Sequence, residues 1–145
     1  GIYAKALAVF SFVYSRSVPL IYSGQELPNR KRLPFFEKDV IEWTDHLELV
    51  SFYSTLLQYR KTSFSTGTTK LLSFDQQVLA FEKADADRLE YVFLNLDRQV
   101  VHIGHWFGDA SAVYLDVFTG KEMELAGHVP IDLEPGGFLL LQKKG

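Results

Sequence analysis

Three ring-bearing side chains close together in the sequence offer the most direct chemistry. His102 and His105 could each supply an imidazole nitrogen to a metal ion, and Trp106 could stack its flat ring against the apolar face of a sugar. The two histidines point to opposite faces of a regular strand, and no acidic residue completes a ligand set. We therefore expect no metal site and no cofactor. Core packing at one end of a β-sandwich is the alternative role for Trp106.

The composition excludes several classes of protein. The 145 residues contain 15 Lys and Arg against 18 Asp and Glu, a formal charge of −3, whereas a nucleic-acid module usually carries a clustered basic excess. With 47% hydrophobic and 23% charged residues, the chain can bury enough apolar area to fold. The lack of cysteine excludes disulfides, thiolate zinc sites and a cysteine nucleophile. It leaves the compartment open, with an extracellular or periplasmic one slightly favoured.

The first residues predict a helix followed by a buried strand. Residues 2–16 are rich in alanine and contain neither Gly nor Pro, and their apolar side chains lie nearly all round the predicted helix. Lys5 interrupts this run, which is too short to span a membrane. Residues 18–24 are apolar without alternation, as in a strand buried on both faces of a parallel sheet. Because Gly1 begins an apolar stretch without a leader, we expect a piece of a longer protein.

A long loop and a second helix follow. Residues 25–43 lack periodicity, and loops of this length are usually functional or disordered. Their basic run, residues 30–32, could contact sugar hydroxyls or an acidic partner, or could be a solvated loop tip. Asp45 with Glu48 three residues later forms the pattern of a capping box, which predicts a helix over 45–61. Its predicted core stripe comprises Leu49, Val50, Tyr53, Leu56 and Leu57.

After residue 63 the pattern changes from helical to strand-like. Short apolar runs are separated by turn residues such as Asp97-Arg98, Thr119-Gly120 and Pro135-Gly136-Gly137. The predicted strands are 69–74, 78–84, 88–96, 99–106, 112–118, 121–125, 128–133 and 137–143. Many short strands with frequent turns indicate an antiparallel β-sandwich. We place a domain boundary near residue 66.

One segment resembles a known family. Residues 18–26 resemble the part of α-amylase-type glycoside hydrolases (family 13) that forms the eighth strand of their (β/α)8 barrel and its exit. The family pattern is roughly Gly-x-Pro-x-x-Tyr-x-Gly-x-Glu, which Pro19, Tyr22, Gly24 and Glu26 match in register. Ser17 stands where the family usually has glycine. Residues 36–39 before Trp43, and the helix end at 57–61, are similar to the elements that follow in that family.

The resemblance implies a fold and a place for the substrate cleft. Residues 1–66 would be the last helix, strand and helix of the barrel, and residues 67–145 a C-terminal antiparallel β-sandwich domain that stabilises it. Barrel chemistry lies at the C-terminal ends of the strands. The residues expected to line the cleft are therefore Gly24, Gln25, Glu26 and Arg30. Alternatively, the Glu26 carboxylate holds its own loop in place.

The resemblance also implies a reaction in which this chain supplies no catalytic residue. The retaining mechanism of the family needs two carboxyl groups about 5 Å apart across the scissile bond. In the family these acids come from the fourth, fifth and seventh strands, which precede the segment present here. The parent protein would hydrolyse or transfer α-glucans such as starch and maltooligosaccharides. The chain alone is expected to be inactive.

Another class of function fits the same residues. The chain could be a free-standing carbohydrate-binding or interaction module whose helices support a β domain. The sequence upstream of Gly1 separates the two hypotheses, because an enzyme requires about 300 preceding residues with seven more strands. Under either hypothesis the apolar surfaces of 2–16 and 18–23 are expected to cause self-association of the chain. We expect neither a nucleic-acid partner nor a membrane span.

Overall fold

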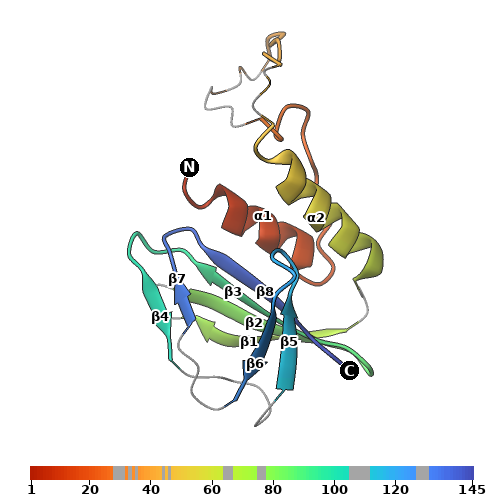
Figure 1. The fold of residues 1–145 in the computed structure, drawn as a ribbon. Coiled ribbons are helices and arrows are strands. Elements are labelled where there is room, and N and C mark those ends of the chain that lie inside the picture. The colour runs from red at the N-terminus through yellow and green to blue at the C-terminus, as the bar shows by residue number, and fades with distance from the viewer. Residues whose placement is uncertain are drawn as a thin grey trace.

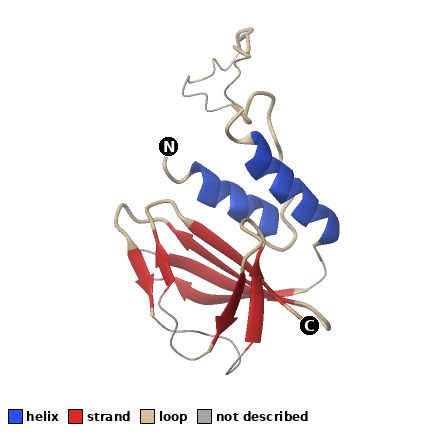
Figure 2. Cartoon of the chain, in the orientation of Figure 1, coloured by secondary structure: helices blue, strands red, loops and turns tan. Residues whose placement is uncertain are grey.

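Two helices cover one face of an antiparallel sheet. The computed structural model describes residues 1–27, 32, 34, 36–43, 45, 47–63, 67–74, 78–104, 112–126 and 131–145. Helices α1 (Ala4–Val13) and α2 (Val50–Thr62) lie next to each other on the same side of the sheet (Figure 1). The strands follow α2 in the chain without a further described helix between them (Figure 2).

The strands form a six-stranded and a two-stranded sheet. The larger sheet has the order β1-β2-β3-β8-β5-β6, and each pair of neighbours is antiparallel. Its strands are β1 (Thr68–Phe74), β2 (Val78–Ala84), β3 (Leu89–Asn95), β8 (Phe138–Lys143), β5 (Ala112–Asp116) and β6 (Glu122–Leu125). The smaller sheet pairs β4 (Val101–Ile103) with β7 (Ile131–Leu133). Each predicted strand after residue 63 has a counterpart, and the mainly antiparallel β fold is confirmed.

The larger sheet buries side chains on both of its faces. Successive residues of a strand point to opposite faces. Val92 and Leu94 of β3 therefore pack under the two helices, whereas Tyr91 and Phe93 enter a second cluster with side chains of β4 and β7. All four side chains are at most 2% exposed. The central strand thus has a hydrophobic layer on each side, as a sandwich requires.

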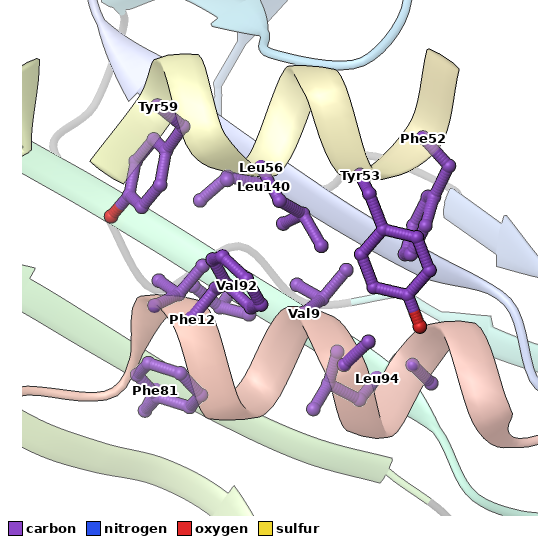
Figure 3. Close-up of a cluster of buried hydrophobic side chains, with 13 residues drawn as sticks. Val9, Phe12, Phe52, Tyr53, Leu56, Tyr59, Phe81, Val92, Leu94 and Leu140 are labelled. Carbon is purple, nitrogen blue, oxygen red and sulfur yellow. The ribbon is translucent and has the colours of Figure 1, made fainter. Parts of the chain in front are cut away.

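The helices attach to the sheet through aliphatic and aromatic side chains. The cluster under them comprises Ala6, Ala8, Val9, Phe12, Val13, Phe52, Tyr53, Leu56, Tyr59, Phe81, Val92, Leu94 and Leu140. Figure 3 shows Val9 of α1 and Leu56 of α2 directed into the space between the helices, where Leu140 of β8 also lies. Leu56 and Leu140 are fully buried, and each such side chain contributes about 1.5–3 kcal/mol to stability.

Helix α1 is shorter than predicted, and the chain before it lies close to the turn between β7 and β8. The prediction of residues 2–16 extends beyond both observed ends, at Ala4 and Val13. A Cβ added to Gly136, in the turn between β7 and β8, would lie 2.1 Å from the carbonyl oxygen of Ile2. Because Gly136 also has φ +71°, glycine is needed there both for the turn and for the close approach. Among the described residues, neither helix has the length and apolarity to cross a bilayer.

Helix α2 begins later than its sequence pattern indicates. It starts at Val50, so Asp45 and Glu48 lie outside it, and no side chain caps its N-terminus. The predicted capping box is therefore wrong. The predicted stripe is also rotated, because Val50 and Leu57 are 39% and 46% exposed. The buried face consists of Phe52, Tyr53, Leu56 and Tyr59. Packing of these aromatic rings against α1 and the sheet outweighs the local capping pattern.

The segment predicted as a buried parallel strand does not form one. Residues 18–22 have no regular secondary structure and residues 23–24 begin a turn, and Val18 and Leu20 are 93% and 79% exposed. A strand requires a hydrogen-bonded neighbour, and none of the described segments pairs with this one. The apolar residues of this segment favour a strand, but a strand does not form because none of the described strands pairs with it.

Candidate functional site

The turn of residues 22–27 contains three of the four residues expected to line a cleft. The Gln25 N–H donates to the Tyr22 carbonyl oxygen at 3.0 Å, and the Leu27 N–H donates to the Gly24 carbonyl oxygen at 3.1 Å. Gly24 has φ +84°, and a Cβ added there would lie 3.1 Å from Cγ2 of Ile41. Glycine thus permits both the left-handed backbone and the contact with the following loop. Leu27 anchors the end of the turn in the interior.

Gln25 fastens this turn to helix α2. Its Oε1 accepts from the Tyr22 N–H at 3.0 Å, and its Nε2 donates to the Tyr53 hydroxyl at 2.8 Å. Burial raises the pKa of Tyr53, the hydrogen bond from Gln25 opposes this increase, and the nearby Glu26 charge adds to it. The side chain of Gln25 therefore organises its own loop, while Glu26 is partly exposed beside it. Their role in lining a cleft stays a prediction.

Arg60 connects α2 to the end of α1 and to the segment before the turn. Its Nη1 donates to the Phe12 carbonyl oxygen at 3.2 Å, and its Nη2 donates to the Ser17 carbonyl oxygen at 2.7 Å. The Ser17 hydroxyl donates to carbonyl oxygens of residues 11 and 14, at 2.6 and 2.7 Å. These bonds satisfy carbonyl groups that the end of α1 leaves open. The turn of residues 22–27 is thus positioned through its flanking segments as well.

Large apolar side chains in residues 18–43 face solvent. The most exposed of them are Val18, Leu20, Tyr22, Phe36, Val40 and Trp43, at 93, 79, 61, 93, 70 and 65%. A monomer rarely exposes many such side chains in neighbouring segments unless they form an interaction site. The surface near residues 18–24 therefore suits contact with other protein surface.

A buried network of polar side chains lies between α2 and the sheet. The Tyr59 hydroxyl donates to Oε2 of Glu90 at 2.6 Å, and Nζ of Lys83 lies 3.9 Å from the same oxygen. Lys83 also donates to the Tyr59 hydroxyl at 3.3 Å, and Nε2 of Gln142 donates to Oε1 of Glu90 at 2.7 Å. Lys83 and Glu90 are 0% and 2% exposed. The sequence analysis missed this network.

Burial shifts two protonation equilibria in this network. It lowers the pKa of Lys83, against the attraction of Glu90, which raises it. It raises the pKa of Tyr59 strongly, and both the charge of Glu90 and the hydrogen bond to it add to the increase. At neutral pH the Tyr59 hydroxyl therefore stays protonated as a donor to the Glu90 carboxylate. The network lies in the interior and does not offer a reactive group to solvent.

The remaining predicted residues divide into two groups. Arg30, His105 and Trp106 lie outside the described residues. His102 lies on β4, and its Nδ1 is 2.5 Å from Oδ1 of Asp132, directly opposite on β7. Both side chains are mainly exposed, at 75% and 60%. In the part of the chain that the structure describes, no group of three metal-ligating side chains comes together.

Several solved α-amylase structures share this fold. No family model matches the sequence, and no curated protein matches it. The noncanonic maltogenic α-amylase AmyB from Thermotoga neapolitana is similar with a TM-score of 0.77 and 21% identity, over 97% of this chain and 36% of that one. AmyP in complex with maltose is similar with a TM-score of 0.76 and 18% identity, over 95% of this chain and 33% of that one. The α-amylase from Geobacillus thermoleovorans complexed with acarbose is similar with a TM-score of 0.70 and 15% identity, over 97% of this chain and 33% of that one.

These similarities define the class of fold. The chain spans about a third of the length of the three enzymes. At these identities the likeness shows that α1, α2 and the antiparallel sheet share the arrangement of one part of an α-amylase structure. The resemblance first indicated by residues 18–26 is confirmed at the level of fold, even though those residues do not form a strand in this chain.

Proposed function

We propose that this chain is the C-terminal part of an α-amylase-type glycoside hydrolase of family 13 that acts on α-glucans. The observation that carries the proposal is coverage, because nearly the whole chain, helices and sheet together, corresponds to about a third of each amylase structure. One of those proteins is a maltogenic amylase and another holds maltose, which supports starch or maltooligosaccharides as substrates of the parent protein.

In the parent protein, residues 1–66 complete the catalytic barrel and residues 67–145 form a β domain that stabilises it. The exposed apolar side chains of residues 18–22 support this division, since a parallel strand acquires its shape and burial from neighbours on both sides. The Gly24–Glu26 turn and Arg30 then lie at the rim of the substrate cleft, where barrel loops hold ligands. Trp106 provides a stacking surface for sugar in the β domain.

The chemistry resides in residues outside this chain. A retaining glycosidase needs a nucleophilic carboxylate and a carboxylic acid/base about 5 Å apart, facing the same bond. Glu90, at 2% exposure, is bonded to Tyr59 and Gln142 in the interior and cannot reach a substrate. Glu26 lies within the turn of residues 22–27 and contributes binding contacts rather than proton transfer. The 145-residue chain therefore catalyses nothing by itself.

A complementation assay tests this proposal. The polypeptide encoded upstream of Gly1 is produced with and without the 145-residue chain, and reducing sugar released from soluble starch is measured. We expect the chain alone to release no reducing sugar, and the two polypeptides together to hydrolyse starch at a sustained rate. Starch turnover by the chain alone would contradict the absence of catalytic residues. An upstream sequence without barrel strands would instead support the free-standing module.

A further inference from the structure

A groove lies between α2 and the strands β5 and β8, and it shares no residue with the turn of residues 22–27. It is a shallow groove, open to solvent, with a volume of about 450 Å³. Its walls include Ser54, Gln58 and Thr62 from α2, Leu115 and Val117 from β5 and the turn after it, and Gln142 from β8. Neither the sequence analysis nor the similarity to amylases points to this groove.

The side chains that line the groove are uncharged. Ser54 and Gln58 are exposed, and neither side chain forms a hydrogen bond within the part of the chain that the structure describes. The Thr62 hydroxyl donates to carbonyl oxygens of its own helix and keeps lone pairs free to accept. A phosphate or carboxylate ligand would require cationic donors, which the described lining does not contain.

The buried network fixes one acceptor at the edge of the groove. Because a carboxylate only accepts hydrogen bonds, the amide NH2 of Gln142 must face Glu90, to which it donates at 2.7 Å. Glu90 is held in turn by the Tyr59 hydroxyl at 2.6 Å. The amide oxygen of Gln142 is therefore turned away from Glu90 and can accept from a ligand. The buried Glu90 therefore orients the Gln142 amide, while no charged side chain lines the groove itself.

We propose that this groove binds a neutral oligosaccharide, specifically an α-glucan. Sugar hydroxyls both donate and accept, which matches the amides of Gln58 and Gln142 and the hydroxyl of Ser54. Leu115 and Val117 supply apolar surface for the C–H face of a sugar ring. The neutral, polyhydroxy chemistry follows from the lining, and the choice of an α-linked glucan rests on the proposed function.

Titration calorimetry of the 145-residue chain with maltoheptaose tests the inference. We expect binding in the millimolar range or tighter, weakened about 2- to 10-fold by Gln58→Ala because one hydrogen bond is lost. The double variant Ser54→Ala/Gln58→Ala should weaken it further. Gln99→Ala is the matched control, since Gln99 is an equally exposed glutamine in the turn before β4. Circular dichroism verifies that all variants are folded.

Three outcomes would overturn the inference. They are no binding of maltoheptaose at millimolar concentration, binding that Gln58→Ala leaves unchanged or Gln99→Ala weakens equally, and equal or tighter binding of the β-linked cellohexaose. None of these outcomes affects the complementation assay, which measures starch hydrolysis with the upstream polypeptide. Failure of the groove and failure of the proposed function are therefore separate results.

Discussion

Two regions of this molecule, the sheet and the segment that follows α1, bury their apolar side chains to very different degrees. In the sheet, Leu94 of β3 and Leu140 of β8 are fully buried, and their strands pair with each other in a continuous antiparallel register. Near the end of α1, Val18 and Leu20 are equally apolar and are 93% and 79% exposed. The difference lies in the neighbours that each segment finds within the chain.

Antiparallel strands can find their partners a few residues away, whereas a parallel strand cannot. The hairpin of β2 and β3 closes through a turn at Asp85–Arg88, so its ladder forms from local sequence. A parallel neighbour needs a crossover of a dozen or more residues and belongs to a larger sheet. The strands of the sheet therefore find their partners within this chain, whereas none of the described segments pairs with residues 18–24.

The largest expected effect of this difference is on association. The exposed side chains around residues 18–43 should drive the 16.6 kDa chain to self-associate, because apolar surface of this kind is removed from water by pairing. Light scattering should give a molar mass that rises with concentration, and Leu20→Ser/Trp43→Ser should lower it. A chain that stays monomeric over the whole concentration range would show that this surface does not mediate self-association.

Breaking the buried network should produce the largest change in stability. Lys83→Met removes the cation beside Glu90, and leaving one buried charge without its partner costs about 3–5 kcal/mol. Urea unfolding measures the loss. Lys70→Met, at an exposed position on the adjacent strand β1, is the matched control and should change stability by less than about 0.5 kcal/mol.

The double variant Lys83→Met/Glu90→Leu distinguishes the cost of the unpaired charge from the cost of altered packing. It removes both charges, so it should be more stable than Lys83→Met alone. A double variant that is less stable than the single one would indicate that Glu90 stabilises α2 mainly through Tyr59 and Gln142.

The same truncation in the two regions sharpens the comparison. Leu94→Ala leaves a cavity between the helices and the sheet and should cost about 2–5 kcal/mol. Leu20→Ala removes an exposed side chain and should change the unfolding free energy by less than about 0.5 kcal/mol. Both values come from urea unfolding at one concentration. Similar losses for the two variants would mean that residue 20 is buried in solution by association.

High pH should destabilise the helix layer through Tyr59. Its folded pKa lies above that of the unfolded chain, so the folded protein keeps a proton that the unfolded chain releases above about pH 10. This contribution is complete below about pH 10, and stability then falls by about 1.4 kcal/mol per pH unit. Lys83 acts in the opposite sense at lower pH, because its lowered pKa lets stability rise toward its ordinary pKa.

Unfolding free energies measured between pH 10 and pH 12 isolate the contribution of Tyr59, because the Lys83 contribution lies mainly at lower pH. Tyr59→Phe should have a smaller slope with pH than the native chain, because the phenylalanine ring has no proton to release. An identical slope for both proteins would assign the alkaline loss of stability to other groups, including Tyr53, whose pKa is also raised by burial.

Local pattern was sufficient to predict the strands of the sheets, although not their order. Alternating apolar residues and the turn at Asp85–Asp87 predicted strand 78–84 with both of its observed ends. The same hairpin contained the signal for the buried network, because pairing Ala84 with Leu89 places Lys83 opposite Glu90. An inward-facing pair of opposite charges could therefore have been predicted from the register. The analysis followed hydrophobic alternation alone and missed it.

Other features depend on contacts that no local pattern contains. The pairing of His102 with Asp132 joins residues 30 positions apart through the β4–β7 sheet. The start of α2 at Val50 reflects aromatic packing against α1 rather than the capping pattern at Asp45. In the candidate site, the turn at Gly24 was predictable from its glycine. The bond from Gln25 to a tyrosine 28 residues later was not.

Removing the Gln25–Tyr53 hydrogen bond should give the smallest change in stability. It tests the comparison between the sheet and the segment after α1 at a single contact. Gln25→Ala removes the link between the turn and Tyr53 and should cost about 0.5–1.5 kcal/mol, with Gln99→Ala as the control. The hydrogen bond from Gln25 lowers the pKa of Tyr53, so its loss should raise that pKa further. Ultraviolet absorbance at alkaline pH measures the change against Tyr53→Phe. An unchanged Tyr53 titration would contradict the hydrogen bond from Gln25 to the Tyr53 hydroxyl and, with it, the attachment of the turn to α2 at this point.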